Sequence, residues 1–337
     1  MSINNTTIAV DAMGGDNSPF KCLKGIEIFS NTHPDVPIKI FGNKNIIEKV
    51  ILNKKIKLSN FDIFHTENNI NNEDTANIIL RQRKESSIFK GLEYVNNNQI
   101  SGFVSAGNTG ALMILSRLKL GMIEGIDRPA ICSLIPTKND YSIMLDLGAN
   151  STVLGKNLLQ FALMGYCYHS IIKPNKEPKI GIINIGTEDH KGLEFLKEAS
   201  DLISSSFLKK YFVGFVEPNT ITSGECDILV SDGYTGNIML KTAEGMSDFI
   251  TGNLKNVFKK SYKNYLAYKL LEKDFKLFKD KINPDKYNGA SLIGVNGISV
   301  KSHGNASAYA FSCAIDKCYE FIKNNINLKI KESFNSL

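Results

Sequence analysis

The sequence predicts an α/β protein with a mostly parallel sheet and helices on both of its faces. Two observations lead to this prediction. Short apolar segments of strand length alternate with longer segments of helical period along nearly the whole chain. Turns that contain glycine follow several of the apolar segments, as they do where a strand passes into a helix. The 337 residues, 42% hydrophobic and 22% charged, fit a large globular protein and exclude a disordered chain.

The first half is expected to contain strands at 6–11, 38–41, 61–65, 100–104, 130–135 and 142–146. Helices are expected from about residue 18, with Pro19 in the first turn, then after 42, at 78–94, from 111 to about 120, and at 158–172. In the second half, strands are expected at 179–185, 212–216 and 228–231, and helices are expected to end near 204 and 326. No linker interrupts this order, so we expect one intertwined α/β catalytic unit over residues 1–337.

An amphipathic, lysine-rich helical segment at 246–282 is inserted in this unit. Residues 255–281 hold nine lysines and three acidic residues, an excess equal to the formal net charge of +6 of the whole chain. Apolar residues from Met246 onward recur at helical spacing, with Lys255, Lys259 and Lys263 on another face. Three interpretations stay open: a surface or dimer helix, an interfacial helix on anionic lipid, or a surface for an acidic protein. Nucleic acid is not expected, because no nucleic-acid motif is present and arginine is scarce in the segment.

The location of the protein follows from two absences in the sequence. No apolar run approaches the about 18 residues that a membrane span needs. Residues 1–7 are polar and show neither the basic nor the apolar region of a secretory signal. We therefore expect a cytoplasmic protein.

Five turns share one design, in which a strand ends, a glycine with a polar neighbour follows, and a helix usually begins. They span residues 11–16, 105–111, 146–150, 186–192 and 232–237. Glycine lets the backbone approach an anion closely, and a helix N-terminus offers N–H groups and partial positive charge. The carboxyl ends of parallel strands line the ligand crevice of such sheets. The five turns together therefore predict a phosphate-handling crevice.

The residues of these turns supply the candidate binding site. They are Asp11, Gly14, Gly15, Asp16, Ser105, Gly107, Asn108, Thr109, Asp146, Asn150, Gly186, Glu188, Lys191, Asp232, Gly236 and Asn237. Neither a dinucleotide-binding GxGxxG pattern nor a nucleotide-binding GxxxxGK pattern occurs at these turns. The six cysteines form no CxxC pair and have no histidine at ligand spacing, so a zinc site is not expected. No Ser–His–Asp order or GxSxG turn supports an acyl-enzyme.

Three further residues are candidates outside the turns. His303 precedes Gly304 at an expected strand–helix junction, where a histidine either caps structure or donates to an oxyanion or phosphate. Arg128 precedes Pro129, and Lys241 lies one turn into the helix that follows Gly236. Both cations are plausible phosphate ligands, although an isolated cation in either place is more often only surface charge.

The ordered set of motifs resembles the PlsX family of bacterial phosphate acyltransferases. The matching segments are DAMGGD (11–16), SAGNTGA (105–111), IDRPA (126–130), DLGAN (146–150), LLQFALMG (158–165), GECDILVSDGYTGNIMLKTAEG (224–245), NGASLIGVNG (288–297) and KSHG (301–304). The resemblance runs from about residue 8 to about residue 322. It implies a three-layer α/β/α fold like that of phosphotransacetylase and the isocitrate and isopropylmalate dehydrogenases, usually as a homodimer.

The resemblance also implies a reaction. A long-chain acyl group passes from acyl carrier protein to inorganic phosphate, and the acyl phosphate feeds a membrane glycerol-3-phosphate acyltransferase in phospholipid synthesis. We expect no cofactor, and the reaction requires no metal, although the clustered aspartates leave binding of a divalent cation open. Members of the family are bacterial, cytoplasmic and peripherally associated with the membrane. The alternatives are a decarboxylating dehydrogenase of the same fold and a non-catalytic scaffold that binds phosphate or a lipid surface.

The residues allow a mechanism in which the enzyme mainly positions phosphate and stabilises charge. Phosphate is expected at the helix N-terminus after Gly107, held by Ser105, Asn108 and Thr109 with Arg128 or Lys191. Backbone N–H groups, His303, Lys241 or Asn237 are expected to meet the oxyanion. Asp11, Asp16, Asp146 and Asp232 are expected to orient these donors, and Asp232 or Glu188 is expected to accept the phosphate proton.

Overall fold

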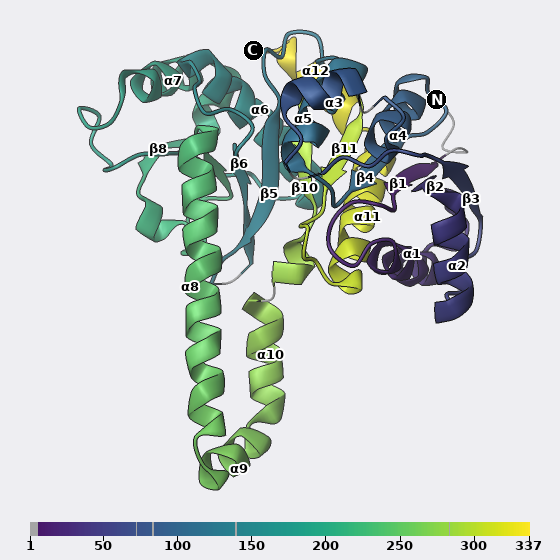
Figure 1. The fold of residues 1–337 in the computed structure, drawn as a ribbon. Helices are drawn as coiled ribbons and strands as arrows, with labels where there is room; N and C mark the ends of the chain where they lie inside the picture. Colours follow the sequence, from purple (N-terminus) through teal and green to yellow (C-terminus); the bar gives the residue numbers. More distant parts are fainter. Residues whose placement is uncertain (1–5, 72, 83, 139, 283) are drawn as a thin grey trace.

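The computed structural model describes residues 6–71, 73–82, 84–138, 140–282 and 284–337, and Figure 1 shows its fold. The expectation that the chain has no secretory signal rests on residues 1–7, and residues 1–5 lie outside the described residues. In the described residues, one sheet of eleven strands has the order β3-β2-β1-β4-β11-β10-β5-β6-β9-β7-β8. The sheet therefore joins strands from the beginning and the end of the chain.

The first half of the chain alternates strands and helices much as the sequence predicts. Its elements are β1 (Ile8–Asp11), α1 (Phe20–Thr32), β2 (Ile38–Gly42), α2 (Lys44–Lys54), β3 (Phe61–His65), α3 (Ala76–Gln82), α4 (Ser87–Asn96), β4 (Gly102–Ser105), α5 (Thr109–Leu120), β5 (Ala130–Pro136), β6 (Tyr141–Leu145) and α6 (Gly155–Ile172). The expectation of a single helix over 78–94 is wrong, because a new helix, α4, begins after Ser86. The hydroxyl of Ser86 accepts a hydrogen bond from the Phe89 N–H over 3.3 Å and caps α4.

The second half contains two strands that the sequence analysis did not delimit. Its elements are β7 (Ile180–Ile183), α7 (Glu194–Ser204), η1 (Phe207–Tyr211), β8 (Phe212–Val216), η2 (Pro218–Thr220), β9 (Ile228–Val230), α8 (Gly233–Lys259), α9 (Tyr262–Leu270), α10 (Glu272–Ile282), η3 (Pro284–Tyr287), β10 (Ala290–Ile293), β11 (Ile298–Lys301), α11 (Ala308–Lys323) and α12 (Ile326–Phe334). Strands β10 and β11 form an antiparallel pair in the middle of the sheet.

The sheet is mostly parallel, as predicted, but its direction reverses near the centre. Strands β3, β2, β1, β4 and β11 run one way, because each pairs in parallel with its neighbour. Three successive antiparallel pairings then join β11 to β10, β10 to β5 and β5 to β6. Strands β6, β9, β7 and β8 are again parallel to one another. The carboxyl ends of the two parallel blocks therefore lie at opposite edges of the sheet.

Helices cover both faces of the sheet and make three layers. Along β1, Ile8 and Val10 face a core shared with α1, α11, α6 and α7, while Ala9 faces a second core shared with α4 and α5. Successive strand residues point to opposite faces, so these two cores lie on the two sides of the sheet. Met239 and Leu240 of α8 pack against the second core. This is the three-layer α/β/α arrangement that the family resemblance implies.

An arm made of the outer part of α8 with α9 and α10 projects from the layered body (Figure 1). Rings of Phe258, Tyr268 and Phe275 lie within 6 Å of one another and tie the three helices together. The lysine-rich segment predicted at 246–282 makes up this arm, although its side chains beyond residue 278 are not among those described. Within the described residues, no helix combines the length and apolar character needed to cross a membrane.

Candidate active site

A buried hydrogen-bonded frame joins the ends of the neighbouring strands β1 and β4. The Ser105 hydroxyl donates to Oδ2 of Asp11 over 2.6 Å and accepts from the Gly107 N–H over 3.0 Å. The other oxygen of Asp11 accepts from the Met13 N–H over 2.9 Å. Both strands are buried on both faces, so neither side chain reaches solvent. One carboxylate therefore fixes two of the predicted glycine turns, 11–16 and 105–111.

The two turns approach each other more closely than side chains would allow. A Cβ atom on Gly14 would lie 2.4 Å from the Gly107 nitrogen and 2.5 Å from Oδ2 of Asp11. Position 14 requires glycine because backbone atoms and a carboxylate held by hydrogen bonds cannot move aside for a side chain. Asn108 then begins α5, and its side chain accepts from the Ala111 N–H over 2.9 Å. The turns thus end at a helix N-terminus with exposed Thr109 beside it.

A third turn, after β11, closes on the first two. The Asp16 N–H donates to the Gly304 carbonyl over 2.8 Å. The backbone N–H of His303 donates to Asn288, whose amide in turn donates to the Ser302 hydroxyl over 2.8 Å. The His303 residue is exposed at this turn. We call the turns at 11–16, 105–111 and 302–305 the turn cluster.

Two lysines that the sequence analysis missed lie within the turn cluster. Nζ of Lys21, on α1, donates to the Gly304 carbonyl over 2.6 Å, and only 4% of Lys21 is exposed. Nζ of Lys301, at the end of β11, donates to the Ser302 carbonyl and lies 3.5 Å from the Ala106 carbonyl. Burial lowers the pKa of both ammonium groups, that of Lys301 to about 8. For Lys301, the sequence did offer one signal of a role in the site: this lysine is the first residue of the KSHG motif.

The turn that follows β6 is held by its own carboxylate at the opposite edge of the sheet. Oδ1 of Asp146 accepts from the N–H groups of Ile131, Gly148 and Ala149, and Oδ2 accepts from the backbone and side chain of Asn150. Burial raises the pKa of this carboxyl, although the hydrogen bonds act against the effect. Asp146 and Asn150 are thus occupied in shaping the turn itself.

Helix α8 runs from this second edge toward the turn cluster. Asp232 caps it, accepting from the N–H and the hydroxyl of Thr235 over 2.9 and 2.7 Å. Gly236 packs against the Asp146 carbonyl, and Asn237 lies beside Gly148. Farther along the helix, exposed Lys241 pairs with Glu244 at 2.7 Å. Lys241 is near enough to Lys301 for its charge to lower the pKa of that lysine, so it flanks the turn cluster.

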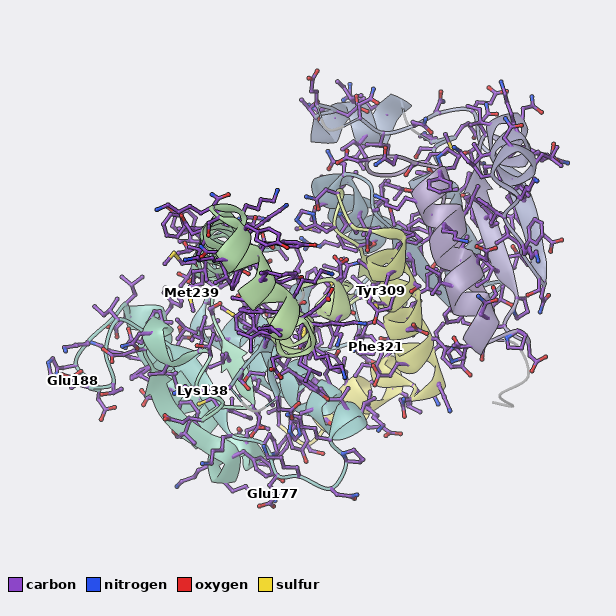
Figure 2. All side chains as sticks on the ribbon, turned by 90° about the horizontal axis from the view of Figure 1, so that it is seen from below. Lys138, Glu177, Glu188, Met239, Tyr309 and Phe321 are labelled. Atoms are coloured by element: carbon purple, nitrogen blue, oxygen red, sulfur yellow. The ribbon has the colours of Figure 1, made fainter. Side chains whose placement is uncertain are left out.

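The expectation that Arg128 or Lys191 lies beside Gly107 is wrong. Arg128 precedes β5 and donates to the Thr152 carbonyl at the β6 end of the sheet. Lys191 forms an exposed ion pair with Glu188 at 2.7 Å in the loop after β7, which includes Gly186. The reversal of strand direction separates these residues from the turn cluster. Figure 2 shows Glu188 at the periphery, far from Tyr309 in the first turn of α11.

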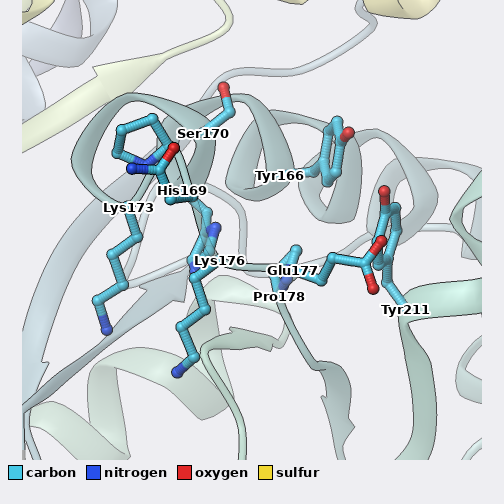
Figure 3. A pocket seen from close by; sticks show the side chains of 10 residues that line it. Tyr166, His169, Ser170, Lys173, Lys176, Glu177, Pro178 and Tyr211 are labelled. Atoms are coloured by element: carbon cyan, nitrogen blue, oxygen red, sulfur yellow. The ribbon is translucent and has the colours of Figure 1, made fainter.

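A surface hollow of about 310 Å³ lies apart from both sets of turns, between the end of α6 and the start of β7 (Figure 3). Its lysines are paired within the chain: Lys176 with Asp227 at 2.6 Å and Lys173 with Asp140 at 2.7 Å. Burial lowers the pKa of His169 beside them. Because these charges neutralise one another, the turn cluster is the better candidate for an anion.

The solved structures most informative for the fold are phosphotransacetylases. One from Streptococcus pyogenes superposes with a TM-score of 0.65 at 15% identity, covering 95% of this chain and 94% of the other. The EutD phosphotransacetylase from Staphylococcus aureus gives a TM-score of 0.56 at 13% identity, covering 99% and 94%. At these identities the likeness defines the fold class, a phosphotransacetylase-like α/β/α protein.

Sequence comparison then identifies the family. The profile of the family described as "Fatty acid synthesis protein" matches residues 6–329. The phosphate acyltransferase of Clostridium tetani is 41% identical over 96% of this chain and 97% of its own length. That of Paramagnetospirillum magneticum is 39% identical over 98% and 94%. The chain belongs to this family, the PlsX family of phosphate acyltransferases, and is an acyltransferase enzyme of lipid synthesis.

Proposed function

We propose that this enzyme transfers a long-chain fatty acyl group from acyl carrier protein to inorganic phosphate and releases acyl phosphate. The observation that carries the proposal is the turn cluster, in which three glycine turns, a helix N-terminus and two lysines, one buried and one partly buried, converge at the ends of adjacent parallel strands. Such a place suits an anion with several oxygens. Family membership supplies the acyl group and the phosphate acceptor.

The reaction requires positioning more than chemical activation. A phosphate oxygen attacks the thioester carbonyl, the carbonyl oxygen becomes an oxyanion, and the C–S bond breaks as the carbonyl re-forms. The phosphate proton ends on the released thiol, so no outside reactant is needed. Donors fixed before the reaction stabilise the oxyanion most effectively. His303 and Lys241, which flank the turn cluster, are the side chains proposed for this role.

The arm provides the surface for larger partners. Along it, eleven large apolar side chains among the described residues each expose at least 45% of their surface: Met246, Phe249, Ile250, Val257, Tyr262, Tyr265, Leu266, Leu270, Leu271, Leu277 and Phe278. Exposed apolar surface on this scale marks an interaction site. We propose that the α8 part packs against a second copy in a homodimer and that the lysine-rich tip contacts the membrane surface.

Membrane contact of a cytoplasmic enzyme fits the chemistry of the proposed product. Acyl phosphate is a mixed anhydride with a long apolar chain, and each methylene that leaves water contributes about 0.8 kcal/mol. Release beside the membrane delivers it to the bilayer, where a membrane glycerol-3-phosphate acyltransferase consumes it. The proposed localisation is therefore cytoplasmic with peripheral membrane association.

The reaction is tested by incubating the purified protein with palmitoyl-acyl carrier protein, with and without inorganic phosphate. Acyl phosphate is trapped as its hydroxamate while the released thiol is measured. We expect phosphate-dependent hydroxamate with an equal amount of thiol. Thiol release without phosphate would identify a thioesterase, and no release from a competent substrate would support a binding scaffold; either result contradicts the proposal.

A further inference from the structure

Lys21, which is buried, and Lys301, which is partly buried, form a pair of cations against the turn cluster. Their ammonium groups contact backbone carbonyls: Lys21 contacts Gly304, and Lys301 contacts Ser302 and Ala106. A Cβ atom on Gly15 would lie 2.7 Å from Nζ of Lys21 and 3.0 Å from the Ala106 carbonyl. The same few backbone groups thus surround both ammonium groups. The two charges are close enough for Lys21 to lower the pKa of Lys301.

No carboxylate contacts either ammonium group directly. Among the described residues, neither lysine forms an ion pair within 4.0 Å, in contrast to the paired lysines of the surface hollow. Two carboxylates act on the pair from farther away: Asp16 and Asp11 on Lys21, and Asp11 on Lys301. The oxygens of Asp11 are already taken by Ser105 and the Met13 N–H. A buried charge is costly unless it is paired, and two buried like charges repel each other. The pair is therefore matched to an anion that the chain itself does not supply.

We propose that Lys21 and Lys301 bind the doubly charged phosphate that accepts the acyl group. Two ammonium groups and a phosphate dianion neutralise one another. The adjoining Gly15 and Gly107 are partly or fully exposed, so phosphate can reach the site from solvent. The lysines act by binding and positioning the acceptor, the task that sequence reasoning gave to Arg128 or Lys191. This inference rests on the proposed acyl transfer to phosphate.

The first test is phosphate binding to the full-length protein by isothermal titration calorimetry. Lys21→Met and Lys301→Met remove one charge each and keep most of the side-chain volume. We expect at least ten-fold weaker binding of inorganic phosphate in each variant, and an equal rise in the KM for phosphate with an unchanged KM for the acyl donor. Lys317→Met is the matched control, because Lys317 is also largely buried but pairs with Glu320 at 2.9 Å. Wild-type phosphate affinity in folded Lys21→Met and Lys301→Met would overturn the inference.

A second measurement needs only the wild-type protein. Near pH 8.5 inorganic phosphate is already a dianion, while free Lys301 is partly deprotonated. The charged groups that act on Lys301 are Lys21 on α1, Asp11 on β1 and Lys241 on α8. A dianion bound against Lys301 raises its proton affinity, so we expect binding to take up between about one-half and one proton. Titration in buffers of different ionisation enthalpy measures this uptake, and its absence would overturn the inference.

The two proposals fail differently. If wild-type protein makes acyl phosphate and the methionine variants keep a normal KM for phosphate, the lysine inference is wrong and the proposed function stands. If phosphate binding depends on both lysines but no acyl phosphate forms, the proposed function is wrong, and with it the role of the lysines in presenting an acyl acceptor. If the variants lose stability equally with and without phosphate and bind phosphate normally, the lysines are only structural, which also overturns the inference.

Discussion

The hydroxyl of Ser105 donates a hydrogen bond of 2.6 Å to the carboxylate of Asp11, and both side chains are buried. The two residues end adjacent parallel strands, β4 and β1, and are 94 positions apart in the chain. The same hydroxyl accepts from the Gly107 N–H. A single contact between strands therefore sets the distance between two glycine turns, and with it the shape of the proposed phosphate site.

Replacing Ser105 by alanine tests this coupling. Ser105→Ala leaves Oδ2 of Asp11 and the Gly107 N–H without their partner, so we expect a loss of about 1–3 kcal/mol in the free energy of unfolding. We also expect a several-fold higher KM for phosphate, because the turns are no longer held together. Urea denaturation and steady-state kinetics measure the two effects.

The matched control for Ser105 is Ser116→Ala. Ser116 is also buried, and its hydroxyl donates to Ser299 over 2.9 Å. We expect a similar loss of stability in this variant without any change in the KM for phosphate. Equal kinetic effects in the two variants would mean that the Ser105 contact stabilises the fold but does not shape the site.

The pKa of Lys301 predicts opposite pH dependences for stability and for phosphate binding. The pKa is about 8 in the folded protein and 10.5 for an unperturbed lysine. Between these values the unfolded chain binds more protons, so the contribution of this group to stability rises with pH, by at most about 1.4 kcal/mol per pH unit. Phosphate binding weakens over the same interval, because the cation is lost.

Difference measurements isolate Lys301 from the other groups that titrate at this pH. We expect the free energy of unfolding of the wild type, minus that of Lys301→Met, to rise from pH 8 to pH 10 in the absence of phosphate. The stabilisation that phosphate gives the wild type is expected to shrink over the same range. A flat difference between wild type and variant would show that the pKa of Lys301 is not lowered in the folded protein.

Two glycines of one helix, α8, are predicted to respond to alanine in opposite directions. A Cβ atom on Gly236 would lie 1.9 Å from the Asp146 carbonyl oxygen, whereas one on Gly252 would meet nothing within 4 Å. Gly236→Ala forces α8 away from the sheet, and we expect a loss of roughly 3 kcal/mol or more in stability. Gly252→Ala is expected to add about 0.5–1 kcal/mol, since alanine favours the helix. Thermal unfolding of both variants checks the pair, and a tolerated Gly236→Ala would contradict the packing of α8 on Asp146.

The sequence was sufficient for most of the local elements and for two of the turns that frame the site, although it did not delimit β10 and β11 or separate α3 from α4. The turn at 11–16 could be predicted because an apolar run followed by glycines needs no knowledge of distant residues. Ser105, Gly107 and Asn108 belong to a second turn of the same kind. The family motifs indicated the α/β/α layers, and the structure confirms them.

The rest depends on contacts between residues far apart in the chain. The strand direction reverses through the antiparallel pairings of β11 with β10, β10 with β5 and β5 with β6. One of them places residue 130 opposite residue 293, and the local sequence pattern of a strand does not indicate such a distant partner. This is why Arg128 and Lys191 were expected near Gly107 but lie elsewhere. The buried ammonium group of Lys21 donates to the Gly304 carbonyl, 283 positions away in the chain. Nothing in the neighbourhood of Lys21 in the sequence distinguishes it from an exposed lysine of α1.

The final prediction concerns the lysine-rich arm, for which membrane binding and docking of the acyl donor compete. Lys259 and Lys263 are exposed near its tip, among exposed apolar side chains such as Tyr262 and Leu266. A lysine near an anionic surface contributes about 1 kcal/mol. We therefore expect Lys259→Glu/Lys263→Glu to bind vesicles containing anionic lipid at least ten-fold more weakly. Its turnover of soluble acyl-acyl carrier protein is expected to remain unchanged.

The control for the arm carries the same change of charge on α2, which lies away from it in Figure 1. Lys49→Glu/Lys54→Glu replaces two exposed lysines there, and we expect it to bind vesicles like the wild type. Co-sedimentation with vesicles at two salt concentrations separates the electrostatic part, which high salt screens. A raised KM for acyl carrier protein in the arm variant, with vesicle binding intact, would assign the lysines to the acyl donor. In that case the apolar side chains of the arm alone would have to account for any attachment to the membrane.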